Sequence, residues 1–327
     1  MEVFITFLLI IFSILLMGKG SDWLTDSLIP IARKLGVTGS FVGLILVSAA
    51  VSLPEILVAL FTSFLGYPAI SIGVILGSIV CNIGFMTGLS AFVRPLKVNS
   101  RIILRDGLFS IVVPILVFAV GSGGEISRLE GFAFLLLFLP YVVNVYLHEK
   151  DVSKQEKIAY QKEIEVELEL AGFEFGNLKP GWLTFVLGLA LLLGGAQLFG
   201  NQLIHIVSTF GINEILIGIT LGAIGPSIPN IITSYQAAKR GLGEIAVSET
   251  LGSNIFTLLV TLGLTAILSP ISVSARWLQF DLPAMLIMSF LLFIFIITQQ
   301  TVTRLEGVFL MGGYLFILLL QVMINTI

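Results

Sequence analysis

The chain has 327 residues, of which 57% are hydrophobic and 11% are charged, and its net charge is −3. The apolar residues fall in long blocks, so this composition excludes an ordinary soluble domain and indicates a membrane protein with several spanning helices. The single cysteine, Cys81, cannot form a disulfide within the chain, and His148 and His205 lack metal-ligand spacing. No cluster of basic residues alternates with aromatic residues, so membrane lipids are the expected surroundings and nucleic acid is not an expected partner.

Ten apolar segments approach or exceed the roughly 20 residues that a helix needs to cross a bilayer. They lie at 3–20, 38–64, 70–93, 104–121, 129–147, 181–204, 212–238, 244–268, 279–298 and 305–325. The first segment lacks the basic region and the small-residue cleavage site of a signal peptide, so we expect it to remain as a helix. The predicted fold is an all-α polytopic membrane protein with ten transmembrane helices.

The distribution of Lys and Arg predicts the orientation, because basic residues near helix ends mark the cytoplasmic side. With the N-terminus outside, fifteen basic residues, including Lys19, fall on the cytoplasmic side, and only Arg128 and Arg276 fall outside. We therefore expect a cell-membrane protein with both termini outside and the hydrophilic segment 148–180 in the cytoplasm. That segment is short for a folded domain, and a solvated linker is favoured over a regulatory cation site.

An internal repeat divides the chain into two halves, 1–147 and 181–327, joined by the linker 148–180. A shift of 175 positions aligns 36–101 with 211–276 without a gap, and 17 of the 66 positions are identical. The identities include paired Ser, Pro and Gly residues, which apolar composition does not explain. Since each half holds five spans, the second half must be inverted in the bilayer. Inverted repeats are a plan of secondary transporters, whose site lies at the midplane where the halves meet.

A proline interrupts one predicted span in each half. Within a helix, proline has no N–H for the carbonyl four residues before it. Pro54 should free the carbonyl of Ala50, and Pro229 that of Gly225. Freed carbonyls in a bilayer are costly unless they line a cavity or meet a cation. Hard cations take oxygen ligands, so these two spans are expected to contribute to a cation site.

Polar side chains at helical spacing accompany these prolines and extend into the spans that follow them. The predicted metal ligands are Glu55, Asn230, Ser52, Ser227, Ser78, Ser253, Asn82, Thr257 and Glu249, with Ser48 on the same helical face as Ser52 and Glu55. A carboxylate at the centre of a span costs about 2.5 to 3.5 kcal/mol on insertion scales, so Glu55 favours ion or proton binding. A lone serine in a span favours close packing instead.

Other acidic residues are predicted nearer the ends of spans. Glu249 lies close to the cytoplasmic end of its span, where lining an entrance and direct ligation are both open interpretations. Asp22, Asp26, Glu214 and Glu244 fall at predicted helix ends and are expected at the interface.

Four stretches resemble the two α-repeats of the sodium/calcium exchanger, or cation/Ca²⁺ antiporter, superfamily. They are VGLILVSAAVSLPEILVAL with GVILGSIVCNIGFMTGLSA in motif 43–91, and IGITLGAIGPSIPNIITS with ETLGSNIFTLLVTLGLTAI in motif 218–266. The resemblance implies that an acid of each Ser-Leu-Pro-acid motif and small polar residues of each Gly-Ser-Asn helix bind Ca²⁺ or Na⁺. It also implies that the first and sixth helices slide over a core of the second, third, seventh and eighth spans.

The chain departs from that family pattern at positions that carry charge or oxygen. The second acid is replaced by Asn230, and Thr257 stands where an acid or amide is frequent. Val51 and Pro226 replace the threonines of the Gly-Thr-Ser motif, and Ile79 replaces the first Asn of a Gly-Ser-Asn helix. A desolvated Ca²⁺ beside one carboxylate keeps a net positive charge, whereas one Na⁺ or one H⁺ is matched.

We expect a secondary active cation antiporter that exchanges Ca²⁺ for Na⁺ or H⁺ by alternating access at a midplane site. The alternatives are a relative that moves another cation, a relative that binds a cation without transport, and a passive channel. An intramembrane enzyme is not expected, because no span contains a paired nucleophile and base or two facing aspartates. No cofactor is expected besides the transported cations, and the sequence does not indicate an oligomeric state.

Overall fold

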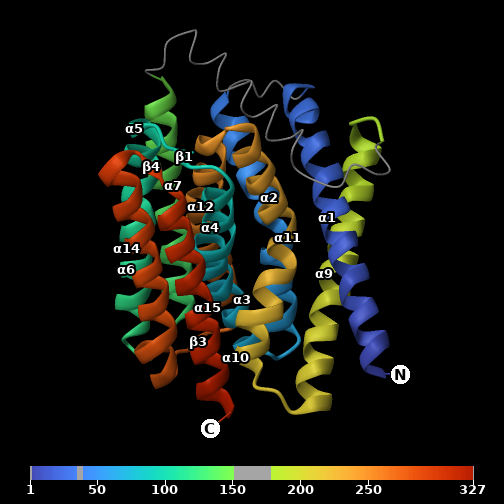
Figure 1. Ribbon diagram of the computed structural model, residues 1–327. Coiled ribbons are helices and arrows are strands. Elements are labelled where there is room, and N and C mark those ends of the chain that lie inside the picture. The colour runs from blue at the N-terminus through green and yellow to red at the C-terminus, as the bar shows by residue number, and fades with distance from the viewer. Residues whose placement is uncertain (1, 35–39, 151–177, 327) are drawn as a thin grey trace.

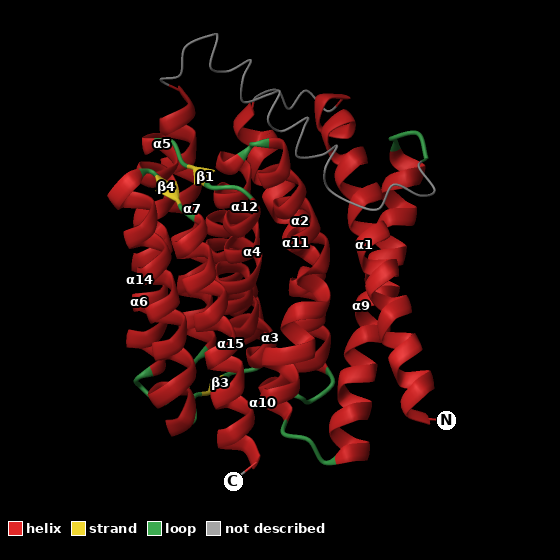
Figure 2. Cartoon of the chain, in the orientation of Figure 1, coloured by secondary structure: helices red, strands yellow, loops and turns green. Residues whose placement is uncertain are grey.

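The computed structural model describes residues 2–34, 40–150 and 178–326, which form a bundle of nearly antiparallel helices (Figures 1 and 2). The first half comprises α1 (Glu2–Lys34), α2 (Ser40–Phe64), α3 (Pro68–Cys81), η1 (Asn82–Thr87), α4 (Gly88–Val93), β1 (Leu96–Lys97), α5 (Ser100–Ile102), η2 (Ile103–Gly107), α6 (Leu108–Gly121), β2 (Glu125–Ile126) and α7 (Arg128–Lys150). Most of the predicted linker 148–180 lies outside the described residues.

The second half repeats this order. It comprises α9 (Trp182–Phe210), α10 (Glu214–Ile217), η3 (Gly218–Gly222), α11 (Ala223–Arg240), α12 (Gly243–Phe256), η4 (Thr257–Thr261), α13 (Leu262–Leu268), β3 (Ile271–Ser272), η5 (Trp277–Asp281), α14 (Leu282–Gln299), β4 (Thr301–Val302) and α15 (Arg304–Thr326). The η segments are π-helical turns inside spans. Nine described helices are long and apolar enough to cross a membrane, and Ala49–Phe64 of α2 is a shorter tenth.

The first helix is longer than the sequence predicted. α1 continues through Gly20 to Lys34, so Lys19, Asp22 and Asp26 lie within the helix and not at its end. Lys19 and Asp22 are both 6% exposed, and their charged groups lie 3.8 Å apart. An ion pair three residues apart on one helical face reduces the cost of keeping polar residues in the span. The predicted end of the first helix near residue 20 is therefore wrong.

Two small sheets display the inverted symmetry of the halves. β1 pairs with β4, and β2 pairs with β3, both antiparallel. The shift of 175 positions carries β1 onto β3, and a shift of 176 positions carries β2 onto β4, so each sheet is the repeat-related counterpart of the other. The two sheets lie at opposite ends of the bundle (Figure 2). Gly66 and Gly241, another repeat-related pair, have φ of +88° and +85° in the turns after α2 and α11, which favours glycine at both.

Both chain termini lie at one end of the bundle, which we call the terminal end (Figure 1). We call the opposite end, where α1 ends at Lys34 and α11 ends at Arg240, the basic end. Termini at one end are what an even number of spans requires. The nine long apolar helices and the shorter tenth in α2 therefore agree with the predicted plan of ten helices.

α1 and α9 form a pair on one side of the bundle (Figure 1). Their backbones approach closely at glycines: a Cβ on Gly20 would lie 2.5 Å from the backbone N of Leu192, and one on Gly188 would lie 2.7 Å from that of Leu24. Small residues that allow such approach are typical of helix contacts in membranes. This pair contacts the remaining helices mainly through α2 and α11.

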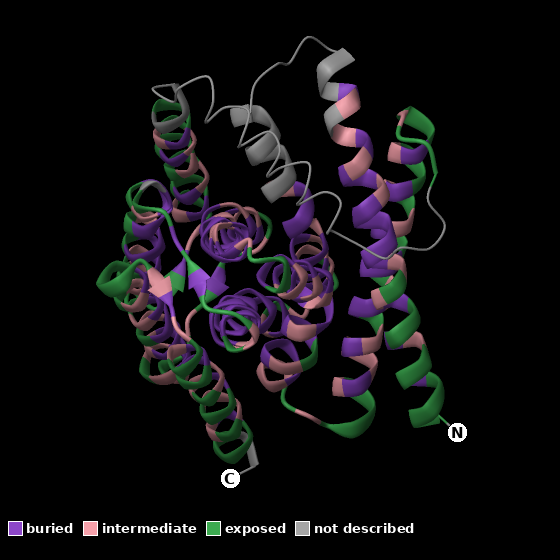
Figure 3. Cartoon of the chain, turned by 45° about the horizontal axis from the view of Figure 1, so that its top comes forward, coloured by how far each residue is buried: buried purple, intermediate pink, exposed green. Residues whose placement is uncertain are grey.

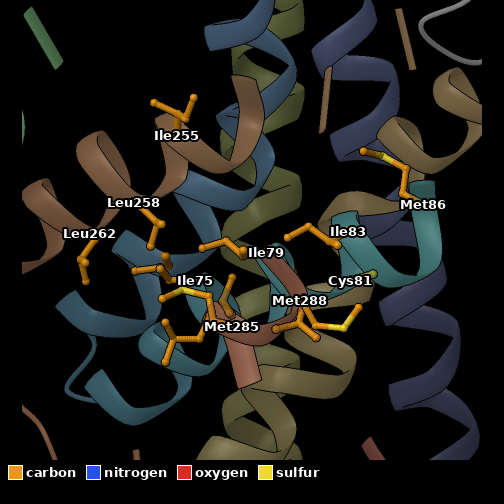
Figure 4. Close-up of a cluster of buried hydrophobic side chains, with 14 of the residues drawn as sticks. Ile75, Ile79, Cys81, Ile83, Met86, Ile255, Leu258, Leu262, Met285 and Met288 are labelled. Carbon is orange, nitrogen blue, oxygen red and sulfur yellow. The ribbon is translucent and has the colours of Figure 1, made fainter. Parts of the chain in front are cut away.

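The centre of the bundle consists of the spans that contain α2, α3, α11 and α12. Figure 3 tilts the basic end toward the viewer and shows that the central helices are buried, whereas the outer helices have exposed faces. An apolar cluster between α3, η4 and α14 includes Ile79, Leu258 and Met288, which are at most 1% exposed (Figure 4). Ile79 therefore contributes to packing, and its replacement of a family asparagine is explained by these apolar neighbours.

Candidate cation site

The carboxylate of Glu55 lies at the contact between the two halves. Glu55 follows Pro54 inside α2 and is 1% exposed. The hydroxyl of Ser227 in α11 donates a hydrogen bond of 2.6 Å to its Oε1, and the hydroxyl of Thr257 in η4 donates one of 3.4 Å to its Oε2. A carboxylate of the first half is thus bound by two hydroxyls of the second half.

Further polar pairs across the halves surround this carboxylate. The hydroxyl of Ser52 donates to that of Ser253 over 3.3 Å, and the Asn82 amide nitrogen donates to the Asn254 side-chain oxygen over 3.3 Å. The Asn82 side chain also lies beside Glu55. All four side chains of the two pairs are at most 5% exposed. Oxygens and amides from four spans therefore converge on one buried place.

Two of these residues begin π-helical turns. η1 starts at Asn82 and η4 starts at Thr257, and these positions are related by the repeat. π-turns inside α-helices are rare and frequently occur at functional sites. Two of the five π-turns in the described residues, η1 and η4, begin at polar residues beside Glu55. The local backbone, as well as the side chains, is therefore repeated around the carboxylate.

Two more of the predicted ligands are buried on the same helices. Ser78 is 0% exposed and Asn230 is 1% exposed. Among the described residues, neither the Ser78 hydroxyl nor the Asn230 amide nitrogen has a hydrogen-bond partner. Polar atoms buried without a partner are costly, so a polar or charged ligand is favoured beside them.

The charge of this cluster is small. In the part of the chain that the structure describes, no three residues of Asp, Glu, His or Cys come together. Glu55 supplies one carboxylate, while its bonded neighbours Ser227 and Thr257 supply neutral groups. The donors are a carboxylate, hydroxyls and amides, which are ligands for hard cations.

The freed carbonyl that the sequence predicted has a partner on α1. The hydroxyl of Ser21 donates to the carbonyl oxygen of Ala50, four residues before Pro54, over 3.4 Å. In the second half, the ring of Phe199 in α9 lies directly against Gly225, four residues before Pro229. The pair α1 and α9 thus contacts both proline-containing helices next to the cluster.

The structure brings six of the predicted ligands together: Glu55, Ser52, Ser227, Ser253, Asn82 and Thr257. Glu249 is buried, but it lies eight residues from Thr257, or about 12 Å along the helix axis toward the basic end. The side chain of Ser48 lies outside the described residues. The sequence interpretation missed Ser21 and Asn254, although Asn254 belongs to the quoted Gly-Ser-Asn motif.

A family model described as sodium/calcium exchanger protein matches residues 5–147 and 180–323, which cover most of both halves. The chain belongs to the sodium/calcium exchanger family. It is thus a multi-pass integral membrane protein of a transporter family, and the resemblance found in the sequence motifs is confirmed.

Relatives match this family member over nearly their whole length. It is 30% identical to the sodium/calcium exchanger MaX1 of Methanosarcina acetivorans, over 95% of this chain and 96% of the relative. It is 27% identical to the inner membrane protein YrbG of Escherichia coli, over 94% of each chain. Among solved structures, the sodium-calcium exchanger NCX_Mj soaked with Na⁺ and Sr²⁺ matches with a TM-score of 0.65 and 27% identity, covering 96% of this chain and 98% of that one. These matches confirm the predicted membrane-exchanger fold.

Proposed function

We propose that this exchanger-family protein moves Ca²⁺ against Na⁺ or H⁺ by alternating access, with the Glu55 cluster as the shared cation site. The observation that carries the proposal is a carboxylate buried between two inverted halves and bound by hydroxyls of the opposite half. A site on the axis between inverted repeats can be reached from either side when one group of helices moves.

Burial of Glu55 supports a cation as its partner. A carboxylate inside a bilayer is costly, and such residues typically mark ion or proton pathways. Its neighbours Ser227, Thr257 and Asn82 supply neutral oxygens and amides that could replace part of the hydration shell of an ion. Among the described residues, no second carboxylate competes for the same ion in this cluster.

The single charge sets the expected ion preference. Ca²⁺ beside Glu55 alone keeps a net charge of about +1 in a medium of low dielectric, whereas Na⁺ or H⁺ is neutralised. We therefore propose that Ca²⁺ binds more weakly here than it would beside two acids. MaX1 and NCX_Mj, the similar proteins named above, are sodium/calcium exchangers by name, which supports Ca²⁺ and Na⁺ as the ions to test first.

We propose that the basic end faces the cytoplasm. Lys150, Lys179, Lys239 and Arg240 lie at or near helix ends on this side, and basic residues resist translocation. Both termini then face outside. Glu249, nearer the basic end than the cluster, would line the cytoplasmic approach to Glu55.

The test is exchange in liposomes that contain the purified chain. Radioactive Ca²⁺ uptake is measured with an outward Na⁺ gradient, with an outward H⁺ gradient, and with neither. Antiport predicts uptake only when a counter-cation gradient is present. Uptake that needs no opposing cation would identify a channel, and saturable Ca²⁺ binding without uptake would identify a non-transporting cation-binding protein.

Restoring the missing charge tests the proposed ion preference. Asn230→Glu adds a second acid at a buried position three residues from Ser227, and it should lower the KM for Ca²⁺ at least about tenfold, since charge pairing in a buried site is worth more than about 1.4 kcal/mol. Asn230→Gln is the matched control, because glutamine has the size of the introduced glutamate but adds no charge. A KM for Ca²⁺ that both variants change equally would contradict the charge argument.

A further inference from the structure

The contact between α1 and α2 joins the mobile pair expected for this family to the candidate cation site. The hydroxyl of Ser21 reaches across 29 residues of sequence to the carbonyl of Ala50. Ser21 is 6% exposed and Ala50 is 1% exposed, so water is largely excluded from this contact. Because Pro54 has no N–H, the carbonyl of Ala50 needs a donor or a cation from outside its own helix.

The length of this hydrogen bond indicates a weak contact. The Ala50 carbonyl can therefore exchange the Ser21 hydroxyl for another partner. The hydrogen-bond length of 3.4 Å clearly exceeds the most frequent length of hydroxyl–oxygen hydrogen bonds in proteins. Ala50 precedes Glu55 by five residues, so its carbonyl lies about 7 Å along the helix axis toward the basic end. The Ala50 carbonyl therefore lies on α2 between the basic end and Glu55, on the side of α2 that faces α1.

The second half offers no equivalent hydroxyl. The repeat-related counterpart of Ser21 is Ala196, a fully buried residue without a donor in its side chain. Next to Gly225, the counterpart of Ala50, the same helix presents the ring of Phe199. The inverted repeat therefore does not require a serine at position 21, and a symmetric packing role does not account for it.

We propose that Ser21 is a positioning residue for exchange: its hydroxyl occupies the Ala50 carbonyl in this arrangement of α1, and the transported cation displaces it. Cation binding near Glu55 and movement of α1 along α2 are then coupled through one shared acceptor. This inference rests on the proposed function, because it assumes that the Glu55 cluster binds a transported cation.

The test compares three single variants of the full chain in liposomes, with the counter-cation gradient that drives the wild type. Ser21→Ala removes the competing donor, so the KM for Ca²⁺ should fall about two- to tenfold, as expected from the net strength of one hydrogen bond. Its maximal rate should also fall, because the closed arrangement loses a contact. Ser21→Thr keeps the hydroxyl and should retain the KM of the wild type.

Ser13→Ala is the matched control. Ser13 lies on the same helix, is 0% exposed, and donates to the carbonyl of Ile10 in its own helix. Loss of packing alone would reduce the number of active molecules and lower the maximal rate without a lower KM. A KM of Ser21→Ala equal to that of the wild type, or a fall that Ser13→Ala shares, would overturn the inference.

A binding measurement separates this inference from the proposed function. The Kd for Ca²⁺ is measured on each purified chain in detergent, where no transport is needed. Tighter binding by Ser21→Ala together with transport by the wild type supports the inference, whereas a wild type that binds Ca²⁺ without transport would overturn the antiport proposal and the coupling to movement of α1. An unchanged Kd together with normal wild-type transport would overturn the inference alone, and a wild type that binds no cation would overturn both.

Discussion

The hydrogen bond between Ser227 and Glu55 joins the two halves at a single carboxylate. At 2.6 Å it is short, as hydroxyl bonds to an ionised acceptor are, and both residues are at most 1% exposed. Thr257 binds the other oxygen of the same carboxylate more loosely, at 3.4 Å. The orientation of Glu55 is therefore set chiefly by one residue of the opposite half.

Ser227→Ala should raise the KM for the transported cation about ten- to a hundredfold. The reason is that a bond to a charged group is worth about 1.5 to 3 kcal/mol and that the carboxylate loses its orientation. The matched control is Ser234→Ala in the same helix, because Ser234 is also fully buried but pairs with Ser90. Initial rates of exchange in liposomes across cation concentrations give the comparison. Equal effects of the two substitutions would contradict a specific role for Ser227.

At this scale, the residues nearest Glu55 could be predicted, but the contact of Ser21 in α1 with the carbonyl of Ala50 could not. The register of the repeat relates Ser52 to Ser227 and Ser78 to Ser253, and inversion brings Ser52 to Ser253 and Ser227 to Glu55. Ser21 was missed because the first helix was expected to end at residue 20. A single serine beside an aspartate forms no periodic pattern. The sequence therefore does not distinguish a packing role from a contact with a distant carbonyl.

At the scale of elements, the pair α1 and α9 depends on glycines that allow backbones to approach. Gly20 and Gly188 lie at this crossing, and an added Cβ on either would meet backbone atoms of the other helix. Backbone atoms cannot move aside as a flexible side chain can. Lys19 and Asp22 lie next to the crossing, where both are buried and their charged groups lie 3.8 Å apart.

Gly188→Ala should separate the two helices and lower the free energy of unfolding by about 1 to 3 kcal/mol, as overpacking does. The matched control is Gly194→Ala on the same helix, where an added Cβ meets no atom within 4 Å. Thermal denaturation of both variants in one detergent measures the difference. If the two midpoints agree, the close approach of α1 and α9 in this structure is contradicted.

The length of α1 was the main error in predicting elements from the sequence. The polar run after Gly20 was taken as the end of a span, but tertiary contacts with α9 and the Lys19–Asp22 pair keep it helical. α9 also runs six residues beyond its predicted end, to Phe210, while the other spans agree with the prediction to within a few residues. The π-turns at η1 and η4 have no signal in the sequence that we recognised.

At the scale of the whole molecule, the inverted repeat explains where the candidate cation site lies and how the two ends of the bundle are closed. The sheets β1–β4 and β2–β3 close opposite ends of the bundle, and each takes one strand from each half. The halves are thus joined at both ends as well as at Glu55. The ungapped alignment of the two halves made this plan readable from the sequence, whereas the orientation in the membrane depends only on the distribution of charge.

Labelling of introduced cysteines tests that orientation. Cys81 is fully buried, so the parent chain should not react with a membrane-impermeant maleimide. Ser122→Cys at the exposed terminal end should react in intact cells, and Lys179→Cys at the exposed basic end should react only in inside-out vesicles. The reverse pattern would show that both termini face the cytoplasm.

The most direct test of the central claim, that Glu55 holds the transported cation between the two halves, is exchange by Glu55→Gln in liposomes. Glutamine keeps the size of the side chain but removes its charge, so we predict that counter-cation-driven Ca²⁺ uptake falls to the level of protein-free liposomes. Glu125→Gln, which neutralises an exposed carboxylate in β2, should retain wild-type uptake. Uptake by Glu55→Gln at the wild-type rate and KM would contradict the account.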